Sequence, residues 1–520
     1  MKHKYSLLSS LLVASVASVA ANHQRPNIVL ILCDDMGFSD LGCYGSEIGT
    51  PHLNSLAERG VRFSQFKNAG RSCPSRASLL TGRYQHSVNM GWMTAVDEHR
   101  DGYRGELSNY FPTIAEVLRE EGYETDMSGK WHVTVETALE KPDGSYPVER
   151  GFNRYYGSLK GGDSYYAPKA VYSNLTPVKS LPKNYYYTTA ITDSAVSFIR
   201  QHPIHRPLFL YLAHYAPHLP WQGLKERVEA CTNRYKVGYD VLRRQRFERL
   251  KALGFVDKNK ALPMFQKEFG GSRPAWTSLT PQQQEQWITR MANYAAMIET
   301  MDDGIGKVME ATKEKGLFDN TIFLFLSDNG ATSEGDLLTQ LSADLSNTPY
   351  RSYKQWCFQG GTSSPLIIAA GNKISGYPRG TICNEPAHII DLLPTCLEMA
   401  SVTYPKQFRQ HRVKAPDGCS LVPIVQGRKG VKRDLYFEHQ TSCAIISGHW
   451  KLVRSNAKQP WELIDLSTDP FEEHDLAAQN PTRVKRMEKK WNKWAQRQQV
   501  LPFEFRSWSE RINYYTRLNL

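Results

Sequence analysis

The sequence contains no pair of cysteines at C-x-x-C spacing. Its nine cysteines are an odd number and are spread widely along 520 residues. Closely spaced pairs are typical of zinc frameworks and dense disulfide scaffolds, so both classes are excluded. The chain also has no internal repeat and no low-complexity tract, which excludes a repeat architecture. A hydrophobic content of 41%, with 11 Trp and 27 Tyr, instead predicts a folded globular protein.

Long hydrophobic runs are scarce, and the one candidate lies at the N-terminus. Residues 5–17 are mostly apolar, but this run is short for a membrane span. Basic residues precede it and small residues follow it, which is typical of a secretory signal peptide. We therefore predict a signal peptide over residues 1–21, no stable membrane span, and an exported protein that is periplasmic or secreted. An uncleaved anchor is the alternative.

The chain carries a positive net charge but no cluster of basic residues. Lys and Arg number 64 against 52 Asp and Glu, which gives a formal net charge of +12. The basic residues are spread along the chain and no nucleic-acid-binding module is present, so we predict no nucleic-acid partner. A basic surface favours an anionic partner, although charge that only maintains solubility is the alternative.

Apolar runs of strand length alternate with helical patterns through most of the chain. Strands are expected at 27–33, 123–128, 208–213, 321–326 and 365–370, and helices at 112–121, 188–202 and 288–315. This alternation predicts an α/β fold with a large, mostly parallel sheet sandwiched by helices. Residues 222–287 are charged and helix-rich and contain no strand pattern, so we expect a helical insertion that lies over the sheet.

The pattern changes after about residue 425. Short strands are expected at 435–437, 444–446, 450–453 and 461–464, followed by an amphipathic helix at 482–497. We therefore predict two parts. Residues 22–424 form a catalytic domain, and residues 425–520 form a small α+β subdomain with an antiparallel sheet and one packed helix.

The run Ser72-Cys73-Pro74-Ser75-Arg76 predicts the start of a helix. Proline suits the first helical turn, and Gly82 can end the helix in the left-handed conformation. Ser72 then lies at a helix N-terminus, where backbone N–H groups and the helix dipole favour an anion. The alternative is a plain serine cap with Arg76 on a solvated face.

Polar side chains follow four of the predicted strands. In open α/β sheets such groups meet beyond the carboxyl ends of the strands, where ligands bind. Carboxylate and amide oxygens are the ligands that Ca²⁺ or Mg²⁺ prefers. Each aspartate taken alone could instead be a turn or cap residue. The metal-ligand candidates on this reasoning are Asp34, Asp35, Asp328 and Asn329.

The run from Ser72 to Arg83 resembles the sulfatase signature, in which Cys or Ser is followed by Pro two positions later and by Arg four positions later. Ser72 has this spacing, whereas Cys73 has Pro one position and Arg three positions later. In sulfatases the first residue of the signature is oxidised to formylglycine, whose hydrate attacks sulfate esters. The resemblance therefore implies a serine-type sulfatase in which Ser72, and not Cys73, is modified.

Further motifs extend the resemblance over nearly the whole mature chain. An early Asp-Asp, a late Asp-Asn-Gly, Gly-Lys-Trp-His and Ala-Pro-His all have counterparts in the family. The chain departs from the family with Val133-Thr134 where Leu-Gly is usual and with Gln359 where Glu is frequent. His86 and His214 are expected to be structural or subsite residues. The implied catalytic residues are Ser72, Arg76, Lys130, His132, His218 and Lys354, and the implied metal ligands are Asp34, Asp35, Ser72, Asp328 and Asn329.

The resemblance implies an alkaline-phosphatase-like fold and a sulfuric ester hydrolase acting on sulfated carbohydrates or aryl sulfates. It implies a Ca²⁺ or Mg²⁺ ion, and a bacterial host with a radical-SAM enzyme that matures Ser72. It also implies that His218 protonates the leaving alcohol and that His132 accepts a proton from the hydrate. Three alternatives remain: a formylglycine-dependent phosphonate monoester or phosphodiester hydrolase, a non-catalytic sulfated-glycan binding protein, and a weakly active enzyme with unmodified Ser72.

Overall fold

The computed structural model describes residues 25–136, 139 and 142–518. The predicted signal peptide, residues 1–21, lies outside the described residues. Within the described part of the chain, no helix is both long and apolar enough to cross a membrane.

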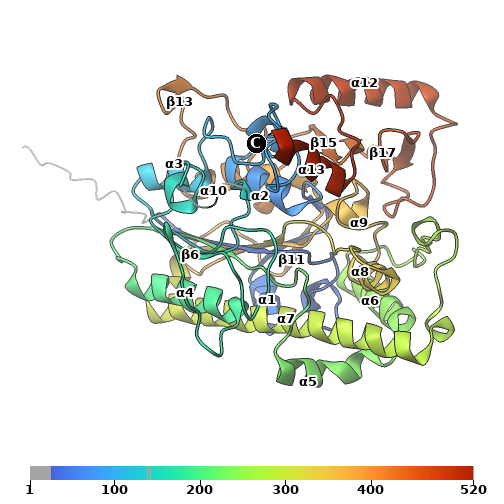
Figure 1. Ribbon diagram of the computed structural model, residues 1–520, viewed down its shortest axis with the longest axis horizontal. Coiled ribbons are helices and arrows are strands. Elements are labelled where there is room, and N and C mark those ends of the chain that lie inside the picture. The colour runs from blue at the N-terminus through green and yellow to red at the C-terminus, as the bar shows by residue number, and fades with distance from the viewer. Residues whose placement is uncertain (1–24, 137–138, 140–141, 519–520) are drawn as a thin grey trace, which may run out of the picture.

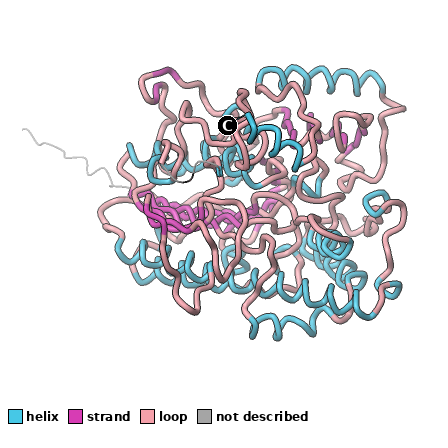
Figure 2. The backbone as a smooth tube through the Cα atoms, viewed as in Figure 1, coloured by secondary structure: helices cyan, strands magenta, loops and turns pink. Residues whose placement is uncertain are grey.

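A ten-stranded sheet runs through the centre of the molecule, seen edge-on in magenta in Figure 2. Its five central strands are parallel and lie in the order β9, β1, β8, β4, β5. Their bounds are Thr321–Ser327, Asn27–Cys33, Leu208–Ala213, Glu124–Gly129 and Arg154–Ser158. The flanking strands are β11 (Thr381–Cys383), β2 (Gly60–Phe63) and β10 (Leu366–Ala370) beside β9, and β6 (Val171–Ser173) and β7 (Thr176–Pro177) beside β5. The predicted α/β fold with a mostly parallel sheet is confirmed, although β10 pairs antiparallel with both β9 and β2.

Helices cover both faces of this sheet (Figure 1). One face carries α1 (Pro51–Glu58), α4 (Tyr187–Gln201) and α7 (Pro281–Glu314), and the other carries α2 (Ser72–Thr81), α3 (Ile114–Glu120) and α10 (Leu392–Met399). All seven residues of β1 are buried. Val29 and Ile31 belong to the core on one face, whereas Ile28 and Leu30 belong to the core on the other. A continuous apolar run is therefore what a strand covered on both faces requires.

Residues 222–287 contain α5 (Lys225–Tyr235), α6 (Tyr239–Leu253) and no described strand. Helix α5 packs against α7, and α6 contacts α8 (Leu337–Ser346). Helix α5 therefore lies on the far side of α7 from the sheet (Figure 1). Helix α7 itself begins at Pro281, earlier than the predicted residue 288, because Thr280 and Gln283 form a capping box there.

The C-terminal part forms a four-stranded antiparallel sheet with a packed helix, as predicted. Its strands are β15 (Asp434–His439), β16 (Ser442–Ser447), β17 (Trp450–Arg454) and β18 (Glu462–Asp465). Helix α12 (Pro481–Arg497) packs Trp491 and Trp494 against this sheet. A last helix, α13 (Trp508–Leu518), was not expected from the sequence. Shorter elements are β3 (Phe66–Lys67), β12 (Ala387–His388), β13 (Gln407–Phe408), β14 (His411–Arg412), α9 (Gln359–Thr362) and α11 (Val422–Val425).

Candidate active site

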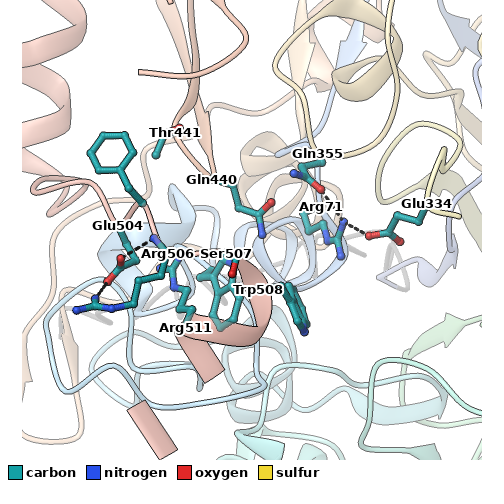
Figure 3. Close-up of a pocket in the computed structure, with 12 residues that line it drawn as sticks. Arg71, Glu334, Gln355, Gln440, Thr441, Glu504, Arg506, Ser507, Trp508 and Arg511 are labelled. Carbon is teal, nitrogen blue, oxygen red and sulfur yellow. Dashed lines mark hydrogen bonds and ion pairs between the residues drawn. The ribbon is translucent and has the colours of Figure 1, made fainter. Parts of the chain in front are cut away.

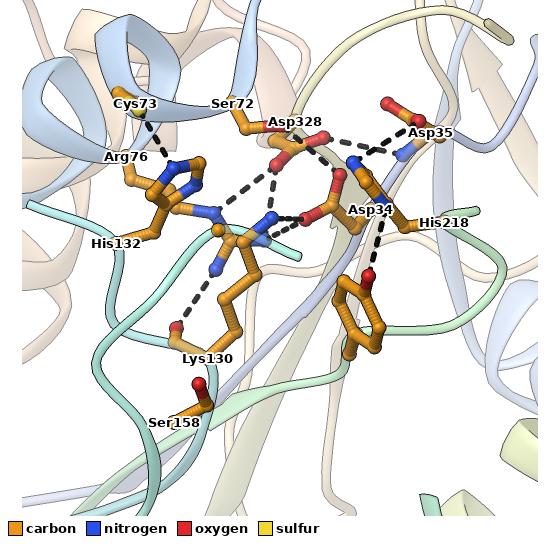
Figure 4. Close-up of polar contacts among 12 residues, drawn as sticks. Asp34, Asp35, Ser72, Cys73, Arg76, Lys130, His132, Ser158, His218 and Asp328 are labelled. Atoms are coloured by element: carbon orange, nitrogen blue, oxygen red, sulfur yellow. Dashed lines mark hydrogen bonds and ion pairs between the residues drawn. The ribbon is translucent and has the colours of Figure 1, made fainter. Parts of the chain in front are cut away.

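Ser72 is the first residue of α2, and its side chain faces the carboxyl ends of the parallel strands (Figure 4). Its hydroxyl lies 3.0 Å from Oδ1 of Asp34 and 3.2 Å from Oδ1 of Asn329. The helix ends as the sequence predicts, because Gly82 takes a left-handed φ of 66° and its N–H donates to the carbonyl of Ser78. The helix N-terminus thus directs the Ser72 hydroxyl at the acidic residues.

Cys73 faces a different group. Its sulfur lies 3.1 Å from Nε2 of His132. Burial raises the pKa of the Cys73 thiol to about 11, so the thiol is protonated at neutral pH. A protonated thiol is a poor nucleophile. The geometry around α2 therefore agrees with the signature spacing, which selects Ser72 rather than Cys73.

The four predicted metal-ligand candidates lie together next to Ser72. Asp34 and Asp35 directly follow β1, and Asp328 and Asn329 directly follow the adjacent β9. The Asn329 amide donates to Oδ1 of Asp35 at 2.7 Å, and the backbone N–H of Asp35 donates to Oδ1 of Asp328 at 3.4 Å. Asp35 also has a left-handed φ of 64°, a backbone conformation that concentrates at functional sites. Parallel pairing therefore brings the four side chains to one point.

Three buried cations hold these carboxylates, and Arg76 and Lys130 are labelled in Figure 4. Arg76 donates through Nε to Oδ2 of Asp328 at 3.1 Å and through Nη2 to Oδ2 of Asp34 at 2.9 Å. Lys130 forms an ion pair with Asp34. Lys354 donates to Oδ2 of Asp35 at 2.9 Å. The three cations balance the formal charge of the three carboxylates.

The two aspartates bound by Arg76 have different proton affinities. Burial favours the neutral form of Asp34, but Lys130, His218 and Arg76 together hold its pKa well below the usual value. Burial and the negative charge of Asp34 raise the pKa of Asp328 to about 7, against the opposing effect of Arg76. Asp34 is therefore the firmly ionised member of the cluster.

Both predicted histidines lie beside the cluster. Nε2 of His218 lies 3.7 Å from Oδ2 of Asp35, and its Nδ1 lies 3.1 Å from the Tyr215 hydroxyl. Burial lowers the pKa of His218 to about 4, more strongly than Asp35 raises it. Burial, with the charge of Lys130, also holds the pKa of His132 well below 6.5. Both imidazoles are therefore neutral at pH 7 when no anion is bound.

Sequence reasoning missed two features that contact these predicted residues. Glu334 carries one oxygen 2.6 Å from Nη1 of Arg71 and the other 3.3 Å from Nζ of Lys354. Its position in the loop that follows Asp328 was the only available signal. At Gly161 a Cβ would lie 2.2 Å from Nε2 of His132, so only glycine allows this backbone to approach the imidazole.

His86 and His214 do not join the cluster. Nε2 of His86 lies 2.7 Å from an oxygen of Glu438 in the C-terminal sheet. The ring of His214 is fully buried and has no hydrogen-bond partner among the described residues. By contrast, the other predicted site residues lie in the cluster or contact it directly, except His132, whose ring contacts Cys73 and Glu136 beside the cluster.

The donor set of the cluster fits a hard divalent cation. Ligand atoms of Asp34, Asp35 and His218 lie within 4.8 Å of one another. Asp328 and Asn329 bring further oxygens to the same point. Carboxylate and amide oxygens dominate this group, and such donors suit Ca²⁺ or Mg²⁺. His218 was not expected in the carboxylate group from the sequence, where it was assigned as a general acid.

The chain is similar to proteins of one known family. The family model described as "Sulfatase" matches residues 26–402. An uncharacterized sulfatase of Schizosaccharomyces pombe is 31% identical over 532 residues, covering 91% of this chain and 93% of the relative. An arylsulfatase of Klebsiella aerogenes is 33% identical over 445 residues, covering 78% of this chain and 93% of the relative.

A solved structure shows that the likeness extends to the fold. The crystal structure of Ps i-CgsB in complex with k-i-k-neocarrahexaose superposes with a TM-score of 0.70 and 26% identity, covering 95% of this chain and 98% of that one. The family match, the relatives and the shared fold together identify the chain as a member of the sulfatase family, the sulfuric ester hydrolases.

Proposed function

We propose that this sulfatase removes sulfate from sulfated carbohydrates or aryl sulfates, and that its nucleophile is a formylglycine made from Ser72. The convergence of Asp34 and Asn329 on the Ser72 hydroxyl, at 3.0 and 3.2 Å, is the observation that carries the proposal. A nucleophile at the N-terminus of α2 faces both hard oxygen donors and buried cations, which an anionic ester requires. When position 72 is oxidised, its hydrated aldehyde would supply the attacking oxygen.

The proposed cation is Ca²⁺ or Mg²⁺, held by Asp34, Asp35, Asp328, Asn329 and the residue at position 72. When bound, it would lower the pKa of a hydroxyl at position 72 and favour an anionic substrate. The charge of the site also favours an anionic substrate once such a cation is bound. Because the three carboxylates already balance Arg76, Lys130 and Lys354, a divalent cation leaves the site with a net positive charge.

The buried cations bind and orient the sulfuryl group in this proposal. Lys130 and Lys354 each have a carboxylate partner and are fully or almost fully buried. In such an environment an ammonium group stabilises developing negative charge far more strongly than in water. Arg76 is a positioning residue, because its guanidinium fixes Asp34 and Asp328 with three hydrogen bonds.

The two histidines move protons in this proposal. His218 protonates the leaving oxygen from Nε2, because the Tyr215 hydroxyl and the Leu219 carbonyl occupy Nδ1. A sulfate beside His218 favours the protonated imidazole that this step needs. His132 is neutral and contacts Cys73, the residue next to position 72, so we assign it as the group that accepts a proton from a hydroxyl at position 72.

The relatives support both substrate classes. Human N-acetylgalactosamine-6-sulfatase is 28% identical over 84% of this chain, and the Klebsiella relative is an arylsulfatase. The structure of Ps i-CgsB contains a neocarrahexaose. Maturation of Ser72 by a radical-SAM enzyme, and export directed by residues 1–21, complete the proposal.

Matched sulfate and phosphate esters test this function. The matured protein should hydrolyse p-nitrophenyl sulfate much faster than p-nitrophenyl phosphate or the corresponding phosphonate monoester, and Ser72→Ala should hydrolyse none of them. Faster turnover of the phosphorus esters would favour the phosphonate monoester or phosphodiester alternative. Binding of a sulfated saccharide without turnover, in protein shown to carry formylglycine, would favour the non-catalytic alternative.

A further inference from the structure

A pocket of about 440 Å³ lies between the catalytic part and the C-terminal part (Figure 3). Its volume is in the range of small-molecule sites, about 300–1,000 Å³. Arg71, Glu334 and Gln355 come from loops of the catalytic part, whereas Gln440, Thr441 and Trp508 come from the C-terminal part. The C-terminal segment, for which the sulfatase chemistry has no role, therefore forms most of this pocket.

The pocket lies next to the proposed active site. Arg71 directly precedes Ser72 in the chain. Glu334 pairs with Arg71 inside the pocket and with Lys354, which in turn pairs with the carboxylate cluster. The Glu334 carboxylate is therefore the link between the pocket and the site around position 72.

Trp508 provides an exposed but rigid aromatic surface in the pocket. Its side chain is 42% exposed, although it is large and apolar. The ring packs against Trp92 at 4.8 Å between centroids. Arg511 fixes this arrangement, because its guanidinium lies 4.2 Å from the Trp92 ring centroid and pairs with the buried Glu98. The Arg71 guanidinium also lies 5.9 Å from the Trp508 ring centroid, so a partner would stack on the part of the ring that stays exposed beside Arg71.

The β15–β16 turn presents two polar side chains to the same pocket. Gln440 and Thr441 have left-handed φ angles of 47° and 68°, although neither is glycine. This conformation is particularly unfavourable for the β-branched Thr441. The turn is held by a hydrogen bond from the Thr441 N–H to Glu438 at 2.8 Å. Positive φ at both loop residues is the geometry of a two-residue hairpin turn, which fixes where Gln440 and Thr441 lie.

The arginines of the pocket each have a carboxylate partner. Arg71 pairs with Glu334, Arg506 with Glu504, and Arg511 with Glu98. The pocket therefore offers many hydrogen-bond donors and acceptors but little net charge. Such a surface matches the hydroxyl groups of a sugar better than a second sulfate group, because no cation remains unpaired among these three.

We propose that this pocket binds a sugar ring of the substrate on the leaving-group side, with Trp508 as the stacking surface and Gln440, Gln355 and Glu334 as hydrogen-bond partners. The proposal rests on the proposed function and narrows it from aryl or carbohydrate sulfates to sulfated saccharides. An aryl group could stack on Trp508, but it would leave the surrounding amide and carboxylate groups without partners.

The first test measures binding separately from catalysis. Purified protein with unmodified Ser72 is titrated with neutral N-acetylgalactosamine and with neocarrahexaose, and the heat of binding is measured by isothermal titration calorimetry. We expect at least one probe to bind, and Trp508→Ala to weaken its binding by ~10-fold or more, as is typical of an aromatic hot spot. If neither saccharide binds, or if Trp508→Ala binds with unchanged affinity, the proposal is overturned.

The second test uses the matured enzyme and compares a sulfated saccharide with p-nitrophenyl sulfate. Trp508→Ala and Gln440→Ala should raise KM for the saccharide several times more than KM for the aryl ester. Gln440→Ala remains informative if Trp508→Ala unfolds, since Gln440 does not pack on Trp92. Tyr110→Ala is the control, because Tyr110 is 49% exposed and stacks on His411 instead of lining the pocket. Equal losses on both substrates would overturn the proposal, whereas an enzyme inactive on both would contradict only the proposed function.

Discussion

The sulfur of Cys73 lies 3.1 Å from Nε2 of His132 and does not face the carboxylates that surround Ser72. The side chains of Ser72 and Cys73, although adjacent in the chain, therefore contact different groups: the carboxylates and His132, respectively. We expect Ser72→Ala to lose hydrolysis of p-nitrophenyl sulfate by several orders of magnitude, as removal of a nucleophile does. Cys73→Ala should retain substantial activity, because the thiol is protonated and its contact with His132 lies apart from the carboxylates around Ser72. Inactive Cys73→Ala protein with an unchanged melting temperature would contradict these separate positions.

Removal of the divalent cation should abolish activity. A chelator followed by gel filtration should give inactive protein, and Ca²⁺ or Mg²⁺ should restore its activity. Asp328→Ala should lose both metal content, measured by elemental analysis, and activity by at least ~10²-fold. Glu136→Ala is a matched control, since this acidic residue contacts His132 but lies outside the proposed ligand set. Full activity of the metal-free protein would refute the proposed cation.

His218 should matter most when the leaving group is a poor one. A sugar alkoxide needs a proton to leave, whereas nitrophenolate hardly does. His218→Ala should therefore lose roughly 10²–10⁴-fold on a sugar sulfate and clearly less on p-nitrophenyl sulfate. His132→Ala should instead stall after one turnover and accumulate a sulfated protein that intact-mass measurement detects. Equal losses on both substrates for His218→Ala would show that the proton comes from another group.

His214 should make the protein less stable in acid. Burial lowers its pKa in the folded protein from 6.5 to about 3. Below about pH 6.5 the unfolded state therefore binds a proton that the folded state does not, so the free energy of unfolding falls as the pH falls from 6.5 towards 3. Between pH 7 and pH 5 this loss amounts to about 2 kcal/mol.

The His214→Leu variant isolates this contribution. The ring nitrogens of His214 have no hydrogen-bond partner among the described residues, so the change to leucine removes no hydrogen bond. In urea denaturation, the variant should lose about 2 kcal/mol less between pH 7 and pH 5 than the unchanged protein. Equal losses in the two proteins would show that His214 is protonated in the folded state or that it gains a proton in neither state.

The sequence alone predicted the centre of the sheet and the edge at which the site lies. Continuous apolar runs such as 208–213 have no exposed face, and this identified them as strands covered on both sides. Parallel strands end at one edge, so Asp34 and Asp328 could be expected together before any contact was known. The direction of β10 could not be predicted, because its apolar run is compatible with either pairing.

Features that depend on contacts between distant segments were not predictable. Glu334 has no characteristic spacing to another residue, and its importance follows only from its pairs with Arg71 and Lys354. Helix α13 has a weak sequence pattern, and Trp508 joins the pocket only because it packs on Trp92. The family resemblance gave the reaction class, but it contained no information about this pocket.

The central claim is that Ser72 is the residue that becomes the nucleophile. Tandem mass spectrometry of the peptide that contains Ser72, from active protein made in a host with the maturation enzyme, tests it directly. The account predicts a peptide lighter by two hydrogen atoms, with the change assigned to Ser72 and an aldehyde that reacts with a hydrazide probe. Fully active protein with unmodified Ser72, or an aldehyde located at Cys73, would contradict it.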